Sequence, residues 1–208
     1  MKLYYAPGAC SLSPHVVSRE AGIAVDLKKV NLKEKLVEGG GNYRQVNAKG
    51  YVPALELDNG QVLTEGPAIV QYLADQKPDS GLAPKAGSFE RYKLQERLNI
   101  ISTEIHKGFS PLFKPNTPED YKKIVKENLG VRFDWLDKQL AGKDYVMGKA
   151  FTVADAYLFT VLRWSEPVKL DMSRWPNLVA YLARVAARPK VKEALKFEGL
   201  LKEEARSL

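Results

Sequence analysis

The sequence contains a single cysteine, Cys10, and only two histidines, His15 and His106. One cysteine cannot form an internal disulfide, and a lone thiol is typical of a reducing compartment. The first residues, MKLYYAPGAC, lack the apolar segment of a secretory signal. No apolar run approaches the roughly 20 residues that a membrane span needs. We therefore expect a cytoplasmic protein with no membrane partner.

Net charge is absent from the first 80 residues, where nine Lys and Arg balance nine Asp and Glu. The whole net charge of +7 lies after residue 80, with 23 basic residues against 16 acidic ones. These basic residues are mixed with acidic ones along helical stretches and do not form a single patch. A nucleic-acid partner is therefore not expected.

Strand signals are almost absent after residue 80. Before that point the patterns predict strands at 3–6, 25–30, 52–57 and 61–63, helices at 11–22 and 67–77, and an unassigned segment at 32–50. The segment PDSGLAPKAG resembles a linker. Helices are then predicted at 88–108, 119–140, 152–165, 176–188 and 190–204. We expect an α/β domain over residues 1–80 and an all-helical domain over residues 88–208.

Cys10 lies where the predicted helix 11–22 begins. The unpaired N–H groups and the positive dipole end of a helix favour a thiolate, which would lower the pKa of this thiol. Cys10 and Ser13 have the spacing of a C-x-x-C redox pair without the second sulfur, so the site could form a mixed disulfide but not resolve it. From position alone, a buried inert cysteine and a reactive thiol are equally well supported.

Two short motifs suggest a clamp for a peptide-like anion. Pro53 starts a predicted strand, where an edge strand is the simple interpretation. A cis peptide bond would instead present the Val52 N–H and C=O to an extended ligand. Glu65 and Gly66 open the next helix, where backbone N–H groups favour a carboxylate and Glu65 could bind an ammonium group. For Glu65 alone, a solvated acid at a helix start is the simpler interpretation.

The predicted helix 88–108 divides into three sectors. An apolar stripe and a charged face leave Asn99, Thr103 and His106 in a third sector, which fits a helix that faces a cleft or else the polar edge of its solvent face. His106 could donate a hydrogen bond to sulfur or transfer a proton. His15 does not share a polar sector of its predicted helix with similar residues and is interpreted as a packing or surface residue. The apolar stripe consists of Leu94, Leu98, Ile101 and Ile105.

Two features near the end of the helical region have structural interpretations. Thr152 and Asp155 form a capping box before an apolar run, so Asp155 is interpreted as structural. Phe109, Phe113 and Trp164 could line an apolar pocket, and a place in the core explains them equally well.

Several motifs in this order resemble a bacterial beta-class glutathione S-transferase. They are YYAPGACSL, GYVPAL, LTEGPAIVQYL, LNIISTEIHKGF and FTVADAYLF, and they extend from near the N-terminus to about residue 165. The resemblance implies the cytosolic glutathione transferase architecture, an α/β thioredoxin-like N-terminal domain plus an all-α C-terminal domain. It also implies a homodimer that binds glutathione between the domains and conjugates it to an apolar electrophile, with no cofactor beyond glutathione and no metal.

The resemblance also assigns residues. It makes Cys10 and His106 catalytic. For glutathione binding it implies Lys35 at the glycyl carboxylate, Val52 with cis-Pro53 at the cysteinyl backbone, Glu65 and Gly66 at the γ-glutamyl end, and Asn99, Thr103, Glu104 and His106 from the helical domain. Much of the wider superfamily has Ser at the position of Gly66, and other classes activate glutathione with a hydroxyl group. Tyr5 and Ser11 are therefore alternative activators.

Two alternative functions stay open at the level of sequence. One is a glutathione-dependent thiol-disulfide oxidoreductase that uses Cys10 in a mixed disulfide. The other is a non-catalytic binding or regulatory protein on the same fold, which the basic character of the helical half suggests.

Overall fold

The computed structural model describes residues 1–201 and divides the chain into two compact units. The first unit comprises residues 1–77 together with residues 186–201, and the second comprises Pro78–Val185. The expected helical domain over 88–208 therefore differs at its end, because the last helix packs on the first unit. Within residues 1–201, no helix is both long enough and apolar enough to span a membrane.

The first unit is built on a five-stranded mixed sheet with the strand order β3-β2-β1-β4-β5. β1 is parallel to β2 and antiparallel to β4, while β4–β5 and β2–β3 are antiparallel pairs. The strands are β1 (Lys2–Tyr5), β2 (Asp26–Asn31), β3 (Leu36–Val37), β4 (Ala54–Glu56) and β5 (Val62–Thr64). β3 falls in the segment that the sequence left unassigned.

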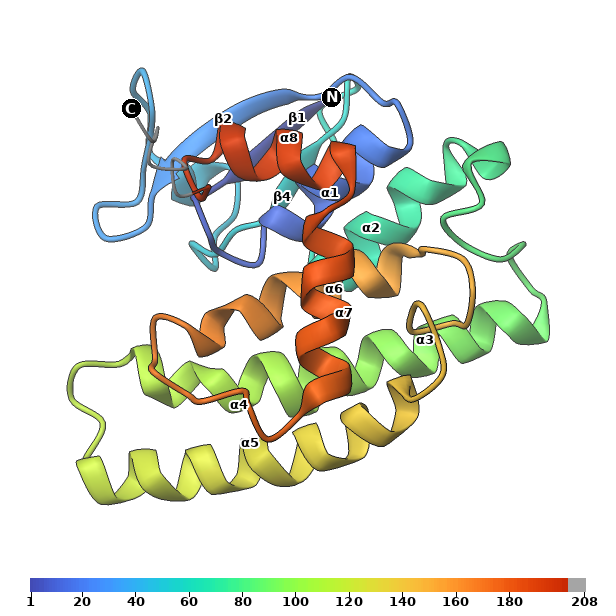
Figure 1. Ribbon diagram of the computed structural model, residues 1–208. Helices are drawn as coiled ribbons and strands as arrows, with labels where there is room; N and C mark the ends of the chain where they lie inside the picture. The colour runs from blue at the N-terminus through green and yellow to red at the C-terminus, as the bar shows by residue number, and fades with distance from the viewer. Residues whose placement is uncertain (202–208) are drawn as a thin grey trace, which may run out of the picture. The chain divides into compact units, whose positions relative to one another are not determined.

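Three helices pack beside this sheet (Figure 1): α1 (Leu12–Glu20), α2 (Gly66–Asp75) and α8 (Pro189–Phe197). α1 contacts both of the others. Because side chains alternate along a strand, neighbouring β1 residues face opposite sides. Tyr5 packs against His15 of α1 and Phe197 of α8, whereas Tyr4 packs against Tyr43. The predicted helix 190–204 is observed as α8 but ends earlier, at Phe197, and a turn follows at residues 198–199. Residues 202–204 of that prediction lie outside the described residues.

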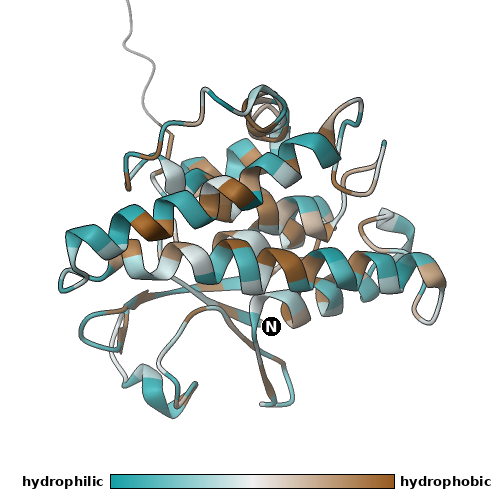
Figure 2. Cartoon of the chain, turned by 90° about the horizontal axis from the view of Figure 1, so that it is seen from below, coloured by the Kyte–Doolittle hydropathy of each residue, from teal (hydrophilic) through white to brown (hydrophobic). Residues whose placement is uncertain are grey.

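The second unit is helical. Its elements are α3 (Phe89–Ile100), a π-helix (Ile101–His106), α4 (Lys107–Phe109), α5 (Glu119–Leu140), α6 (Val153–Leu162) and α7 (Pro176–Ala186), which ends at the boundary between the units. Short 3-10 turns lie at Pro78–Ser80, Ser110–Phe113 and Arg163–Ser165 within this unit, and another lies at Tyr43–Gln45 in the first unit. Figure 2 shows brown and teal residues mixed along these helices, as expected of helices with one buried side.

The predicted apolar stripe of helix 88–108 is confirmed. Leu94, Leu98, Ile101 and Ile105 are all at most 2% exposed. The helix is not regular, however, because the Lys107 N–H bonds to the Ser102 carbonyl five residues earlier. This π-turn lies on the segment that carries the predicted functional residues, a frequent location for such turns.

The capping box predicted at Thr152 is present. The Asp155 carboxylate accepts hydrogen bonds from the Thr152 N–H at 2.8 Å and the Val146 N–H at 2.7 Å. It also accepts one from the Tyr181 hydroxyl at 3.2 Å. Asp155 therefore fixes the start of α6, which supports its structural interpretation.

Candidate functional site

Cys10 lies in the loop between β1 and α1, two residues before the helix. Its Sγ donates a hydrogen bond to the Val52 carbonyl at 3.2 Å. Burial raises the pKa of this thiol to about 12, although the N–H groups of Cys10 and Ser11 act in the opposite direction. The expectation of a lowered pKa is therefore wrong for the protein without a ligand, because removing the thiolate from water costs more than the helix start returns.

Ser11 does not have a free hydroxyl in this loop. Its Oγ accepts a hydrogen bond from the Ala6 N–H at 3.1 Å and donates one to the Ala6 carbonyl at 3.2 Å. The side chain is fully buried. Tyr5 is 6% exposed and faces the side of the sheet that α1 and α8 cover, and burial raises the pKa of its phenol. Both alternative activators are thus held in the interior of the first unit, so their surroundings favour structural roles.

The peptide bond before Pro53 is cis, as the sequence allowed. Val52 is 7% exposed, and its carbonyl is the acceptor of the Cys10 thiol. Within residues 1–201, the Val52 N–H has no hydrogen-bond partner. Because N–H groups in the interior are nearly always paired, this donor is an exception among the backbone groups of the loop.

The segment before Pro53 is held from several sides. The Tyr51 carbonyl accepts hydrogen bonds from the Tyr43 hydroxyl at 2.8 Å and the Asn47 amide at 2.7 Å. Lys35 donates through Nζ to the Gly50 carbonyl at 2.9 Å. A Cβ on Gly50 would lie 3.3 Å from the Lys35 side chain, and Gly50 has φ +68°. A glycine is therefore needed for Lys35 to lie along this loop.

Glu65 has an unusual backbone conformation at the start of α2, with φ +71°. A positive φ is costly for a residue with a Cβ and is frequent at binding sites. Its side chain is 69% exposed and pairs with the ammonium group of Lys49, which also contacts the Thr64 hydroxyl. Lys49 was not predicted, because a single sequence gives no signal for it. The carboxylate of Glu65 is thus already matched to an ammonium group.

Gly66 is buried at the first position of α2. A Cβ there would lie 3.9 Å from the Ser13 hydroxyl, an ordinary contact distance. Packing would therefore allow a serine side chain at this position.

His106 ends the π-helix of the second unit. Its Nδ1 lies 2.6 Å from the Tyr157 hydroxyl of α6. Its ring is perpendicular to that of Trp164, at 4.8 Å and 79°. Tyr157 was not predicted as a partner, because it lies in an apolar run of the sequence. The available signal was the hydroxyl itself, because a buried tyrosine usually hydrogen-bonds through it.

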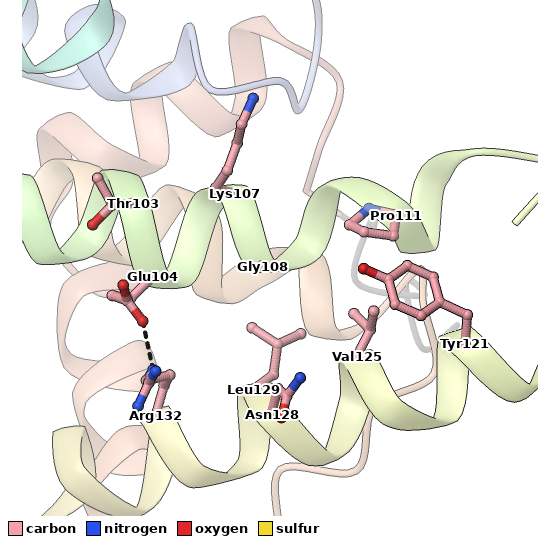
Figure 3. A pocket seen from close by; sticks show the side chains of 10 residues that line it. All are labelled: Thr103, Glu104, Lys107, Gly108, Pro111, Tyr121, Val125, Asn128, Leu129 and Arg132. Atoms are coloured by element: carbon pink, nitrogen blue, oxygen red, sulfur yellow. Dashed lines mark hydrogen bonds and ion pairs between the residues drawn. The ribbon is translucent and has the colours of Figure 1, made fainter.

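Asn99 and Thr103 lie one turn apart and are exposed, and the Thr103 hydroxyl donates to the Asn99 carbonyl at 2.9 Å. Glu104 is paired with Arg132 of α5 at 2.6 Å. Figure 3 shows this pair at one end of a groove of about 390 Å³ between α5 and the segment 103–111. A Cβ on Gly108 would lie 2.8 Å from Leu129, so this glycine allows the two helices to approach closely.

The three aromatic residues named in the sequence analysis have different surroundings. Phe109 is fully buried and belongs to the core. Phe113 is 49% exposed, and its ring is perpendicular to that of Trp164 at 5.6 Å. Trp164 also meets Phe109 at 5.9 Å. Phe113 and Trp164, unlike Phe109, thus offer apolar surface to a ligand.

Comparison with known proteins places these features in a family. Residues 12–81 match the glutathione S-transferase N-terminal domain, and residues 100–189 match the glutathione S-transferase C-terminal domain. The chain is 50% identical to glutathione S-transferase GstA of Escherichia coli O157:H7, over 96% of this chain and 100% of that protein.

Solved structures agree with this relationship. A ternary complex of BphK, a bacterial glutathione S-transferase, superimposes with a TM-score of 0.95 at 53% identity and covers 96% of this chain and 100% of that one. A bacterial beta-class enzyme of Sphingomonas chungbukensis has a TM-score of 0.94 at 49% identity, over 97% of this chain and 100% of that one. The chain therefore belongs to the glutathione S-transferase family and is similar to its bacterial beta class.

Proposed function

We propose that the chain binds glutathione along the Cys10 and Val52 segments and transfers its sulfur to an apolar electrophile. The observation that carries this proposal is the N–H of the buried residue Val52, which has no hydrogen-bond partner within residues 1–201 and lies beside the carbonyl that accepts the Cys10 thiol. The backbone of a bound cysteinyl residue would satisfy that N–H. The ligand would then carry its own sulfur to the neighbourhood of Cys10.

The two ends of the tripeptide have matching groups in the first unit. The Glu65 carboxylate suits the ammonium of the γ-glutamyl group, and its present pairing with Lys49 supports this choice. The Gly66 N–H at the start of α2 suits the adjacent carboxylate. Lys35, which lies at Gly50, suits the glycyl carboxylate. A sphingomonad relative, 48% identical over 97% of this chain, was solved in complex with glutathione.

The second unit is assigned a supporting role in this proposal. Asn99, Thr103 and Glu104 contribute polar groups to glutathione binding, and His106 donates a hydrogen bond to the sulfur. Phe113 and Trp164 present apolar surface to the electrophile. These assignments follow the resemblance of the motif around Asn99 and His106 to the beta class.

The chemistry is a substitution by sulfur. The thiol loses its proton to solvent, and the thiolate forms a bond to an electrophilic carbon. With a chlorinated nitroaromatic compound, the carbon–chlorine bond breaks and chloride leaves with the bonding electrons. The protein contributes by holding the sulfur near its target and by favouring the anionic form.

The raised pKa of Cys10 favours conjugation over the oxidoreductase alternative. A mixed disulfide through Cys10 needs its thiolate, which burial disfavours in the protein without a ligand. In the favoured interpretation, glutathione supplies the nucleophile and Cys10 is its neighbour. A cytoplasmic location stays a prediction of the sequence.

We propose a homodimer as the assembly. Large apolar side chains on α3 support this, since Phe89 is 71% exposed and Tyr92 60%. Light scattering coupled to gel filtration should give twice the chain mass of 23.3 kDa. A mass of one chain at micromolar concentration would contradict the proposal.

The function is tested by conjugation of glutathione to chlorodinitrobenzene and by retention on immobilised glutathione. The wild-type chain should show both activities, and Cys10→Ala should retain conjugation while losing any glutathione-dependent disulfide reduction. Lys143→Gln, at an exposed lysine of the second unit, is the control. Absence of both activities in the wild type would overturn the proposal in favour of a binding or regulatory protein. Loss of conjugation in Cys10→Ala with folding intact would favour Cys10 as the nucleophile.

A further inference from the structure

The pairing of His106 with Tyr157 joins a half-buried imidazole to a buried phenol. The Nδ1 atom and the phenol oxygen lie 2.6 Å apart, and Tyr157 is 2% exposed. The two rings meet edge to face at 5.8 Å and 75°. A short hydrogen bond that is partly shielded from solvent is stronger than one in water, so it can determine the state of the imidazole.

We propose that Tyr157 positions His106 for the conjugation reaction by donating its phenol O–H to Nδ1, which keeps the ring proton on Nε2. This inference rests on the proposed function, in which His106 acts on the sulfur. It goes further by assigning a role to Tyr157 and by specifying which nitrogen of His106 acts.

The direction of the hydrogen bond follows from the acidity of the two groups. A phenol loses its proton with a pKa of about 10, far more readily than a neutral imidazole loses its N–H proton. The unprotonated ring nitrogen is also a better acceptor than a phenol oxygen. In a neutral His106 the stable arrangement is therefore O–H to Nδ1, and the single ring proton is on Nε2.

Two further contacts fix the orientation of the ring. Trp164 meets the imidazole at 4.8 Å and 79°, which restricts its rotation. The π-turn sets the backbone from which the side chain extends. Since Nδ1 and Nε2 lie at different edges of the ring, holding Nδ1 at Tyr157 determines where Nε2 points.

Tyr157 is itself firmly placed. It lies two residues after Asp155, whose carboxylate binds the N–H groups of Val146 and Thr152 at the start of α6. Helix α6 also contacts the π-helix directly. The capping box therefore fixes the start of the helix that carries Tyr157.

The chemical consequence is that His106 is a hydrogen-bond donor at Nε2. In this state it can stabilise a thiolate or developing negative charge, and it cannot accept a proton at Nε2. With this tautomer fixed, His106 can stabilise the anion but cannot act as a general base through Nε2.

The test combines nuclear magnetic resonance with kinetics. Nitrogen-15 spectra of the histidine rings in the full chain report which nitrogen carries the proton, and His106→Ala separates the signals of the two histidines. The wild type should show His106 with its proton on Nε2. Tyr157→Phe should give a mixture of both tautomers and lower kcat for chlorodinitrobenzene about tenfold, the effect of one lost hydrogen bond. His106→Ala should lower kcat at least as much.

Tyr181→Phe is the matched control, because it removes another buried phenol that bonds to Asp155 of the same helix. It should leave the His106 tautomer unchanged. A proton on Nδ1 in the wild type, an unchanged tautomer in Tyr157→Phe, or an equal change in Tyr181→Phe would each overturn the proposal. Full activity of Tyr157→Phe or His106→Ala would do the same. An inactive wild type would instead overturn the proposed function, and the spectra of the free protein would still decide whether Tyr157 sets the tautomer.

Discussion

His15 Nδ1 and Glu198 Oε1 lie 2.8 Å apart, although 183 residues separate them in the sequence. Both side chains are at most 1% exposed. The other Glu198 oxygen accepts the Gly8 N–H at 2.9 Å, and Arg19 donates to the second His15 nitrogen at 2.8 Å. This network connects the segment at the end of α8 to the loop that carries Cys10, which explains why α8 belongs to the first unit.

Removing the Glu198 carboxylate should be strongly destabilising. In Glu198→Ala, the buried His15 ring and the Gly8 N–H both lose their partner, at a cost of about 3 kcal/mol in the free energy of unfolding. Urea denaturation measures this loss. Glu193→Ala is the control, since Glu193 pairs with Lys190 and Arg19 at the surface and should cost less than about 1 kcal/mol. Equal losses in the two variants would contradict the buried network.

The raised pKa of Cys10 predicts a slow reaction with alkylating reagents. With a pKa of about 12, nearly all of the thiol is protonated at neutral pH in the protein without ligand. The rate of alkylation by iodoacetamide should rise about tenfold per pH unit between pH 7 and the highest pH at which the fold survives. Free glutathione, alkylated in parallel, is the control and should react faster at pH 7. A rate that levels off near pH 8 would show that burial does not determine the pKa of the Cys10 thiol.

The longer helices could be predicted from the sequence because their hydrophobic patterns are local. The apolar stripe through Leu94 and Leu98 predicts a buried helix face whatever surrounds it, and the observed burial agrees. The short strand β3 was missed because its two residues, Leu36 and Val37, contain too little pattern to register. The π-turn was not predicted because a helical wheel assumes a regular α-helix throughout.

Features that depend on distant partners could not be predicted from one sequence. The pKa of Cys10 depends on how deeply the folded loop is buried, and the helix start alone pointed in the wrong direction. His15 was interpreted as a packing or surface residue; it is fully buried, and its partner Glu198 was not identifiable from the sequence. The pairs Lys49–Glu65 and Tyr157–His106 likewise join segments whose proximity only the fold supplies.

The capping box gives a prediction with a defined pH dependence. Burial raises the pKa of Asp155 to about 6, against an unfolded value of about 3.9. The folded state therefore holds the proton more tightly, so this group's contribution to stability is full below pH 4 and is lost as the pH rises through 6. The stability advantage of wild type over Asp155→Ala should fall by about 1 kcal/mol between pH 5 and pH 7. Chemical denaturation of both proteins at each pH measures it. An advantage that grows with pH would show that the four hydrogen bonds outweigh burial.

Replacing Glu65 separates binding of glutathione from the chemical step. Glu65→Gln keeps the size of the side chain and removes the charge that we expect to pair with the γ-glutamyl ammonium. A hydrogen bond to a charged group contributes about 1.5–3 kcal/mol, so the KM for glutathione should rise roughly 10- to 100-fold. Because this interaction is the same before and during the reaction, kcat at saturating glutathione should change much less.

The fold should tolerate this change. Glu65 is exposed and makes no side-chain hydrogen bond to the N–H groups at the start of α2, so the stability should shift by less than about 0.5 kcal/mol. Glu90→Gln, at an exposed acid in the first turn of α3, is the matched control and should leave the KM for glutathione unchanged. Steady-state kinetics with varied glutathione and fixed chlorodinitrobenzene distinguish the outcomes. A fall in kcat at unchanged KM would place Glu65 in the chemical step, and wild-type kinetics would remove it from the glutathione site altogether.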